Sequence, residues 1–166
     1  YSFVLIISVI IIAIITWIEF YALISKIFIN ESNKQKFSRF FYKTISLLYL
    51  FFLVYLILTT VTKNQNLFLI LIYSILISIM TDVGGLTFGK IFKGRKLSKI
   101  SPKKTISGAL GSFIFSLLLV PFFNKLLVNY DFITILFLTL VISLISQLGD
   151  LFISFLKRKA NVKNTS

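Results

Sequence analysis

Two aspartates stand in strongly apolar surroundings in this sequence. Asp82 closely follows the apolar run at residues 67–80, and Asp150 lies within another run at residues 132–156. A buried charge is costly unless it is paired with an opposite charge or coordinates a metal ion. Two interpretations are therefore open. Asp150 could form a structural ion pair with a lysine of the basic loop at residues 90–104, or the two carboxylates could share a divalent cation, for which Mg²⁺ is the candidate.

A second chemically distinctive feature is the segment at residues 81–105, TDVGGLTFGKIFKGRKLSKISPKKT. Glycine adopts backbone conformations that other residues avoid, so we expect its four glycines, Gly84, Gly85, Gly89 and Gly94, to let amide groups approach a ligand. The closing SPKKT adds hydroxyls, ammonium groups and the first amides of a helix, a combination that suits phosphate. The spacing is not that of a Walker loop. A flexible turn within a solvated basic loop is the alternative.

The composition indicates the class of protein in which these residues occur. The chain is 57% hydrophobic with a mean hydropathy of +0.96, more apolar than a soluble domain, which indicates an integral membrane protein. It contains no cysteine and no histidine, which excludes thiolate nucleophiles, imidazole bases and Cys/His zinc sites for these residues. In a membrane protein, the formal charge of +13 is better explained by basic loops that fix the topology and by binding of anionic lipid or nucleotide than by binding of nucleic acid.

Apolar runs predict an all-α, polytopic helical bundle with five membrane-spanning helices. The second run has 18 residues, and at a rise of about 1.5 Å per residue it is long enough for the hydrocarbon layer. The third is short alone, and we expect it to extend into the glycine-rich segment. The runs lie at residues 3–18 (extending to 28), 44–61, 67–80, 106–120 (continuing past Pro121) and 132–156.

Basic residues predict the orientation of these spans. Residues 26–43 hold five of them, residues 90–104 seven and residues 157–163 four, whereas the intervening loops hold only Lys63 and Lys125. Short loops rich in Lys and Arg stay on the cytoplasmic side. Asp82 and Asp150 are then both near the cytoplasmic face, with Asp150 about 10 Å along its helix from Lys157.

Polar residues within the spans predict which helices surround a cavity. On the fifth span they recur every three or four residues and share one helical face; they are Ser143, Ser146, Gln147, Asp150, Ser154 and Lys157. Ser74, Ser78 and Asp82 repeat at intervals of four on the third span. Small residues on the fourth span, among them Gly108, Gly111 and Ser112, permit close helix contact. We expect the last three spans to enclose a hydrophilic cavity and the first two to face lipid.

Two ordered motifs resemble the bacterial phosphatidate cytidylyltransferases. The first is Thr81, Asp82 and the glycines, followed by Gly89, Lys90, SPKKT at residues 101–105 and Gly108. The second is Gly149, Asp150 and Leu151, followed by Ser154, Lys157, Arg158 and Lys163, which is similar to the opening of the family's C-terminal signature. The resemblance covers residues 67–166, interpreted as a catalytic core that follows N-terminal transmembrane helices at residues 1–66.

The resemblance implies transfer of CMP from CTP to phosphatidic acid, which gives CDP-diacylglycerol and pyrophosphate. It implies Mg²⁺ as cofactor, with Asp82 and Asp150 as ligands, and Asp82, Asp150 and Lys104 as catalytic residues. The residues expected to bind the phosphates of nucleotide or lipid are Ser101, Lys103, Lys104, Thr105, Ser154, Lys157, Arg158 and Lys163. Expected partners are CTP, phosphatidic acid and the bilayer, with a second copy of the chain as a candidate and nucleic acid not expected. The expected location is the bacterial inner membrane, with the site facing the cytoplasm.

The sequence departs from the family pattern at three points. Ile106 and Ser107 stand where relatives commonly have Trp-Glu, and Asn164 stands where the signature has Asp. The remainder of that signature would follow Ser166, so we expect the chain to be a C-terminally truncated fragment that is inactive alone. Two other functions stay open: a CTP-dependent kinase of polyprenol or phytol type, which acts on a lipid alcohol, and a small membrane transporter whose path the polar residues line.

Overall fold

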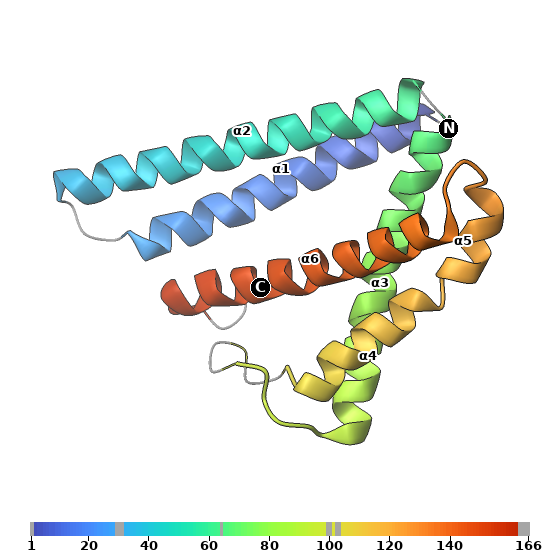
Figure 1. The fold of residues 1–166 in the computed structure, drawn as a ribbon. Coiled ribbons are helices and arrows are strands. Elements are labelled where there is room, and N and C mark those ends of the chain that lie inside the picture. The colour runs from blue at the N-terminus through green and yellow to red at the C-terminus, as the bar shows by residue number, and fades with distance from the viewer. Residues whose placement is uncertain (1, 29–31, 64, 99–100, 102–103, 163–166) are drawn as a thin grey trace. The chain divides into compact units, whose positions relative to one another are not determined.

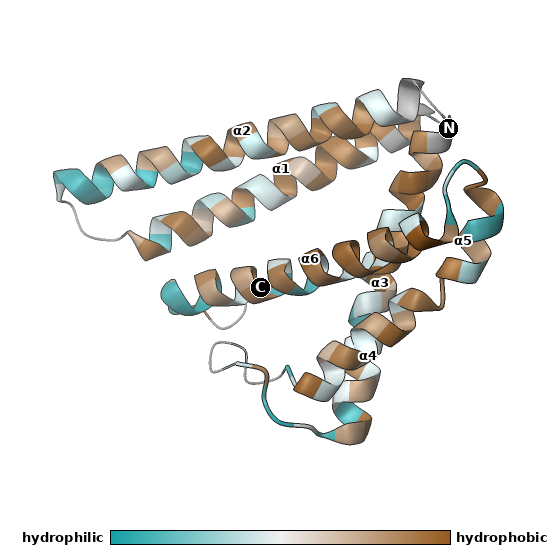
Figure 2. Cartoon of the chain, viewed as in Figure 1, coloured by the Kyte–Doolittle hydropathy of each residue, from teal (hydrophilic) through white to brown (hydrophobic). Residues whose placement is uncertain are grey.

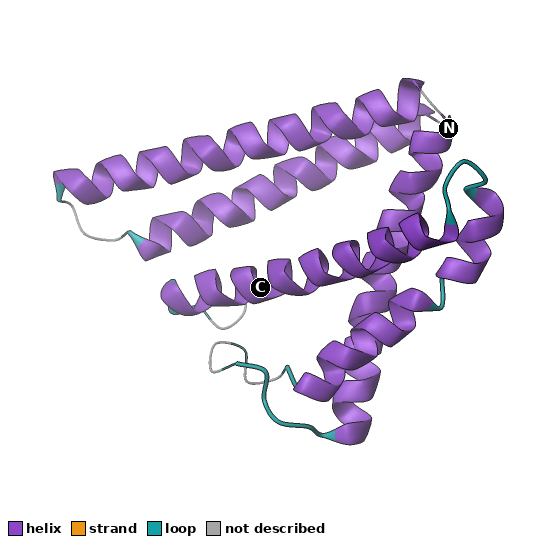
Figure 3. Cartoon of the chain, viewed as in Figure 1, coloured by secondary structure: helices purple, strands orange, loops and turns teal. Residues whose placement is uncertain are grey.

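The structure is a computed structural model that describes residues 2–28, 32–63, 65–98, 101 and 104–162. The described residues are almost entirely helical (Figures 1 and 3), and their helices are α1 (Ser2–Ile27), α2 (Asn33–Lys63), α3 (Gln65–Phe92), α4 (Ile106–Leu117), α5 (Val120–Leu126) and α6 (Phe132–Lys159). Among them, five stretches are long and apolar enough to cross a membrane. The predicted all-α, multi-pass membrane fold is confirmed.

The helix surfaces carry many apolar side chains. Phe51 is 73% exposed and Ile133 is 78% exposed, values that fit contact with lipid because a soluble protein seldom exposes large contiguous apolar surfaces. Hydrophilic residues gather instead at the beginning of α2, at the end of α6 and in the loop between α3 and α4 (Figure 2). The spans therefore follow the hydropathy pattern of the sequence.

Two spans differ in detail from the apolar runs. α3 continues past Met80 through the glycines to Phe92, which confirms that the third span extends into the glycine-rich segment. The fourth span is divided, because α4 ends at Leu117 and α5 begins at Val120. Pro121 lies in the first turn of α5, where its missing N–H leaves no hydrogen bond unmade.

Residue contacts divide the chain into two compact units. The first comprises Tyr1–Gln65 with Leu156–Ser166, and the second comprises Asn66–Phe155. Within the first unit α1 and α2 pack against each other, and Arg39 Nη2 on α2 donates a hydrogen bond to the carbonyl of Phe28, just after α1. The functional division into residues 1–66 and 67–166 stays a prediction.

The second unit has an apolar core with a line of buried hydroxyls beside it. The core consists of Tyr73, Ile77, Val120, Phe123, Leu127 and Ile135. The hydroxyl of Tyr73 on α3 forms a hydrogen bond with Thr139 on α6. Further along, Thr81 Oγ1 donates to Ser143 Oγ at 2.9 Å. Such contacts set the register of α3 on α6, because a shifted helix would leave these buried polar groups unpaired.

Glycines bring α3 and α4 into backbone contact. A Cβ added at Gly84 would lie 2.4 Å from the carbonyl oxygen of Gly111, and one at Gly108 would lie 2.7 Å from that of Gly85. Ser112 Oγ donates to the carbonyl of Thr81 across the same contact at 2.7 Å. The interface follows the small-residue packing expected for the fourth span.

The expectation that Gly84, Gly85 and Gly89 adopt backbone conformations that other residues avoid is wrong, whereas an approach of these amides to a ligand stays a prediction. Gly84, Gly85 and Gly89 lie within α3, and none of the described glycines has a positive φ. Their lack of a side chain, rather than their backbone freedom, is what the fold uses, because the helix backbones are too close for a Cβ.

We predict that Gly84→Ala destabilises the protein. The new methyl group would meet the backbone of α4, which cannot move aside as a side chain can, and overpacking of this kind typically costs about 1–3 kcal/mol. Thermal unfolding of the full-length protein in detergent should show a lower midpoint.

Gly149→Ala is the matched control, since nothing lies within 4 Å of a Cβ there. Alanine is favoured over glycine inside a helix by about 0.5–1 kcal/mol, so this variant should be neutral or more stable. Equal midpoints for the two variants would contradict the close contact.

Candidate active site

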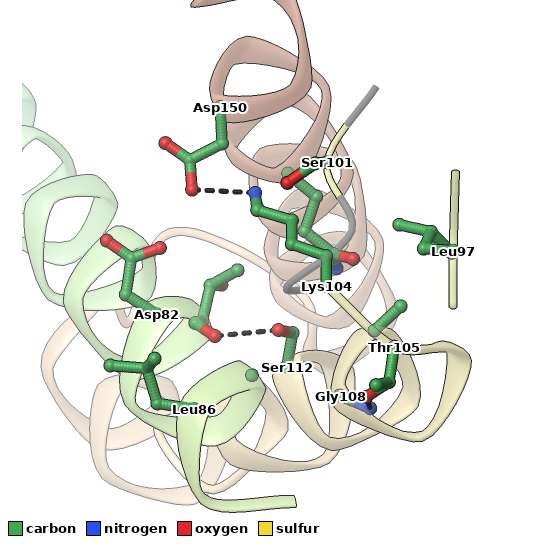
Figure 4. A pocket seen from close by; sticks show the side chains of 13 residues that line it. Asp82, Leu86, Leu97, Ser101, Lys104, Thr105, Gly108, Ser112 and Asp150 are labelled. Carbon is green, nitrogen blue, oxygen red and sulfur yellow. Dashed lines mark hydrogen bonds and ion pairs between the residues drawn. The ribbon is translucent and has the colours of Figure 1, made fainter. Parts of the chain in front are cut away.

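A polar pocket of about 380 Å³ lies within the second unit, between α3, α4, α6 and the loop that precedes α4 (Figure 4). Its volume lies in the usual range of small-molecule sites. The residues that line it are Thr81, Asp82, Gly85, Leu86, Leu97, Ser101, Lys104, Thr105, Gly108, Ala109, Ser112, Gln147 and Asp150. A cavity is thus present among the three spans where the sequence predicts one, and it combines polar and charged side chains with the apolar Leu86, Leu97 and Ala109.

The loop between α3 and α4 folds back on itself and directs Lys104 to the pocket. Two backbone hydrogen bonds join its two arms. The N–H of Leu97 donates to the carbonyl of Lys104 at 2.8 Å, and the N–H of Ile106 donates to the carbonyl of Arg95 at 2.9 Å. Thr105 then caps α4, its hydroxyl accepting a hydrogen bond from Gly108 N at 3.1 Å. This cap satisfies one of the helix-start amides that were candidates for phosphate binding.

Lys104 forms an ion pair with Asp150 across the pocket. The distance from Nζ to Oδ2 is 2.8 Å, and the two side chains are 32% and 53% exposed. The predicted ion pair is therefore present for Asp150, and its partner Lys104 is the last lysine of the basic loop at residues 90–104.

Asp82 lies on α3 and faces the same space as Asp150 (Figure 4). Its carboxylate interacts electrostatically with both Asp150 and Lys104. Among the described residues it forms no ion pair of its own. The structure thus brings together two carboxylates and one ammonium group from α3, α6 and the loop between α3 and α4.

Gln147 is a pocket residue that sequence reasoning did not select for the site. Its Nε2 is buried and has no hydrogen-bond partner among the described residues, which is costly unless a ligand supplies an acceptor. The sequence could have pointed to Gln147, because it precedes Asp150 by three residues and lies on the same predicted polar face. Thr81 and Ser112 also line the pocket and were not selected.

Only some of the other predicted binding residues line the pocket. Ser101 and Thr105 line the pocket. Ser154 lies one turn beyond Asp150 on α6 and is not among the lining residues. Lys157 and Arg158 belong to the first unit, so their roles stay predictions. Lys103 and Lys163 lie outside the described residues.

The donor set fits a magnesium ion that the substrate helps to coordinate. No group of three Asp, Glu, His or Cys side chains suited to a metal is found among the described residues. Mg²⁺ in phosphate-transfer sites is commonly bound by one or two carboxylates, with water and substrate phosphates as the remaining ligands. Asp82 and Asp150 in one pocket can supply those carboxylates.

Comparison with known proteins identifies the family. The sequence pattern of the cytidylyltransferase family matches residues 1–166. The chain belongs to the cytidylyltransferase family. It is 37% identical over 114 residues to a phosphatidate cytidylyltransferase of Rickettsia typhi, a match that covers 63% of this chain and 49% of that protein. It is 40% identical over 107 residues to one of Staphylococcus aureus, covering 63% of this chain and 40% of that protein. The chain thus spans half or less of these relatives, and no solved structure matches it significantly.

We predict that the Lys104–Asp150 pair contributes little to the stability of this cytidylyltransferase-family protein. Partly exposed pairs typically contribute about 0.2–1 kcal/mol, because the side chains lose entropy and the gain is small in a high dielectric. A double-mutant cycle with Lys104→Gln and Asp150→Asn, followed by thermal unfolding, should therefore give a coupling of about 1 kcal/mol or less. A coupling several times larger would mean that the pair is a structural element rather than a site.

Proposed function

We propose that the full protein is a phosphatidate cytidylyltransferase, which transfers CMP from CTP to phosphatidic acid and releases pyrophosphate. The observation that carries the proposal is the convergence of Asp82, Asp150 and Lys104 on one pocket in a membrane-spanning unit. Membership of the cytidylyltransferase family and the names of the relatives support the choice of reaction.

The reaction needs charge neutralisation more than it needs a base. A phosphate monoester with a second pKa near 6 is largely dianionic at neutral pH, so the acceptor oxygen of phosphatidic acid is already deprotonated. This oxygen attacks the α-phosphorus of CTP and forms a new P–O bond. The bond from the α-phosphorus to the oxygen that bridges to the β-phosphate breaks, and its electron pair leaves with pyrophosphate. The absence of histidine from the chain is compatible with this chemistry.

Asp82 and Asp150 would hold Mg²⁺ in this pocket. When bound, the ion would neutralise phosphate charge and orient the in-line displacement. Lys104 is within hydrogen-bond distance of Asp150 and can turn its ammonium group to a nucleotide phosphate once the metal binds the carboxylate. Lys104 would thus offset one of the two carboxylate charges before the substrate arrives and contact the substrate afterwards.

Further pocket residues would position the nucleotide. Ser101 and Thr105 carry hydroxyls beside Lys104, and the unpartnered Nε2 of Gln147 is a donor for an acceptor on the base, ribose or phosphate. The remaining groups are assigned from the family resemblance alone. Lys103 is assigned to the nucleotide phosphates, and Lys157, Arg158 and Lys163 are assigned to the lipid phosphate or to pyrophosphate. Ser154 stays a further candidate for substrate binding. The distribution of basic residues supports a site that faces the cytoplasm, and the bacterial relatives support a location in the inner membrane.

The position of the transferred phosphorus tests the reaction. Membranes that contain the full-length protein, Mg²⁺ and phosphatidic acid should incorporate label from α-labelled CTP into lipid and release the label of γ-labelled CTP as pyrophosphate. Transfer of the γ-label to a lipid alcohol would instead identify a CTP-dependent kinase. Transport of a solute with no incorporation of either label would identify a transporter.

Substitution of the carboxylates tests the metal assignment. Asp82→Asn and Asp150→Asn should each lower label incorporation by about 10²-fold or more, the range for removing one electrostatic contact to a transition state. Each should also raise the Mg²⁺ concentration needed for half-maximal activity. Asp131→Asn is the control, because this aspartate precedes α6 and does not line the pocket. Unchanged magnesium dependence in both pocket variants would contradict the assignment.

A further inference from the structure

A second concave surface lies within the first unit, between α1 and α2. This basic groove has a volume of about 360 Å³ and is lined by Trp17, Tyr21, Lys36, Arg39, Phe40, Lys43, Thr44 and Leu47. It contains three basic side chains and no carboxylate among its lining residues. Its charge therefore favours an anionic ligand directly, whereas the candidate active site contains two aspartates.

Two hydrogen-bond donors in the basic groove are buried without a partner. They are Nε of Arg39 and Nε1 of Trp17, each without an acceptor among the described residues. The Arg39 guanidinium is held in place through Nη2, which donates to the carbonyl of Phe28. Buried donors without an acceptor are costly, and a phosphate oxygen would satisfy them.

Lys43 is also held at the basic groove. Its Nζ lies 3.3 Å from the centre of the Tyr21 ring, a cation–π contact that orients the ammonium group without neutralising its charge. Arg39 and Lys43 are four residues apart on α2 and so lie on the same side of the helix. The basic groove thus presents positioned positive charge together with unpartnered donors.

The basic groove continues into an apolar one. The apolar groove, also about 360 Å³, is lined by Ile10, Ala13, Ile14, Trp17, Leu47, Leu50, Phe51 and Val54. Trp17 and Leu47 line both grooves, which makes the two surfaces adjacent. From Trp17 to Ile10 the apolar groove follows α1 for about 10 Å, a length suited to part of an acyl chain.

We propose that the two grooves together bind one anionic phospholipid. The phosphate lies in the basic groove against Arg39 and Lys43, and an acyl chain lies in the apolar groove beyond Trp17. A nucleotide or free phosphate would leave the apolar groove empty. A zwitterionic lipid would bring its own positively charged group to a surface that is already basic. The proposal does not depend on the reaction assigned to the pocket between α3, α4 and α6.

Trp17 provides a direct probe, because it is the single tryptophan of these 166 residues. The full-length protein is reconstituted in vesicles that contain phospholipid with brominated acyl chains, either anionic phosphatidylglycerol or zwitterionic phosphatidylcholine. The quenching of Trp17 is obtained by subtracting the signal of Trp17→Phe. We expect anionic lipid to quench Trp17 at a lower mole fraction than zwitterionic lipid does, whereas soluble glycerol phosphate should not displace it.

Charge and shape variants separate the two parts of the proposal. Arg39→Gln and Lys43→Gln should each weaken the preference for anionic lipid about fivefold, the typical contribution of one basic residue near a membrane surface. Lys34→Gln is the control, because Lys34 is on α2 but does not line the groove. Ala13→Leu should reduce quenching by filling the apolar groove, whereas Ala22→Leu, outside both grooves, should not.

Three results would overturn the proposal. Equal quenching by anionic and zwitterionic lipid would mean that the basic groove does not select a phosphate. Displacement by glycerol phosphate would identify a soluble anion as the ligand. Absence of quenching by either brominated lipid would mean that another protein segment covers the groove.

Discussion

Contact between the backbones of α3 and α4 is the constraint on which the candidate active site depends. With glycine at positions 84, 85, 108 and 111, the helices approach until an added Cβ would meet backbone or side-chain atoms within 2.8 Å. This closeness lets Ser112 reach the carbonyl of Thr81, next to Asp82. It also brings the capped start of α4, and with it Lys104, beside α3. If α3 and α4 were further apart, Asp82 and Lys104 would not line the same pocket as they do here.

The charges of the pocket fit the divalent cation proposed for it. Its ionisable lining residues are Asp82, Asp150 and Lys104, so the site carries more negative than positive charge before any substrate enters. A nucleotide triphosphate and a lipid phosphate would add further negative charge. In the proposed mechanism a divalent cation at the two carboxylates would offset this negative charge and release Lys104 from its pair with Asp150. The partial exposure of the pair, 32% and 53%, keeps this exchange accessible.

The basic groove between α1 and α2 differs in charge from the pocket between α3, α4 and α6, because its lining contains basic residues and no carboxylate. Its positive charge comes from side chains alone, and two of its donors are buried without an acceptor. Such a surface suits a permanently bound monoanion. The pocket between α3, α4 and α6 instead combines two carboxylates with a lysine in a partly exposed ion pair, a combination that suits the metal and polyanion proposed for it. The two proposals thus assign lipid binding and substrate chemistry to different surfaces of this chain.

Local patterns in the sequence determined the helical class, the five spans and the polar face of α6, because hydropathy and a period of 3.6 residues depend only on neighbouring residues. They also placed Asp82 and Asp150 among the site residues. Tertiary structure alone decided that Lys104 pairs with Asp150, 46 residues away, and that the glycines serve helix packing. It likewise brought Trp17 and Arg39 to one groove. These outcomes depend on how closely and in which register separate helices meet, which is set by side-chain fit between them and not by the pattern within either one.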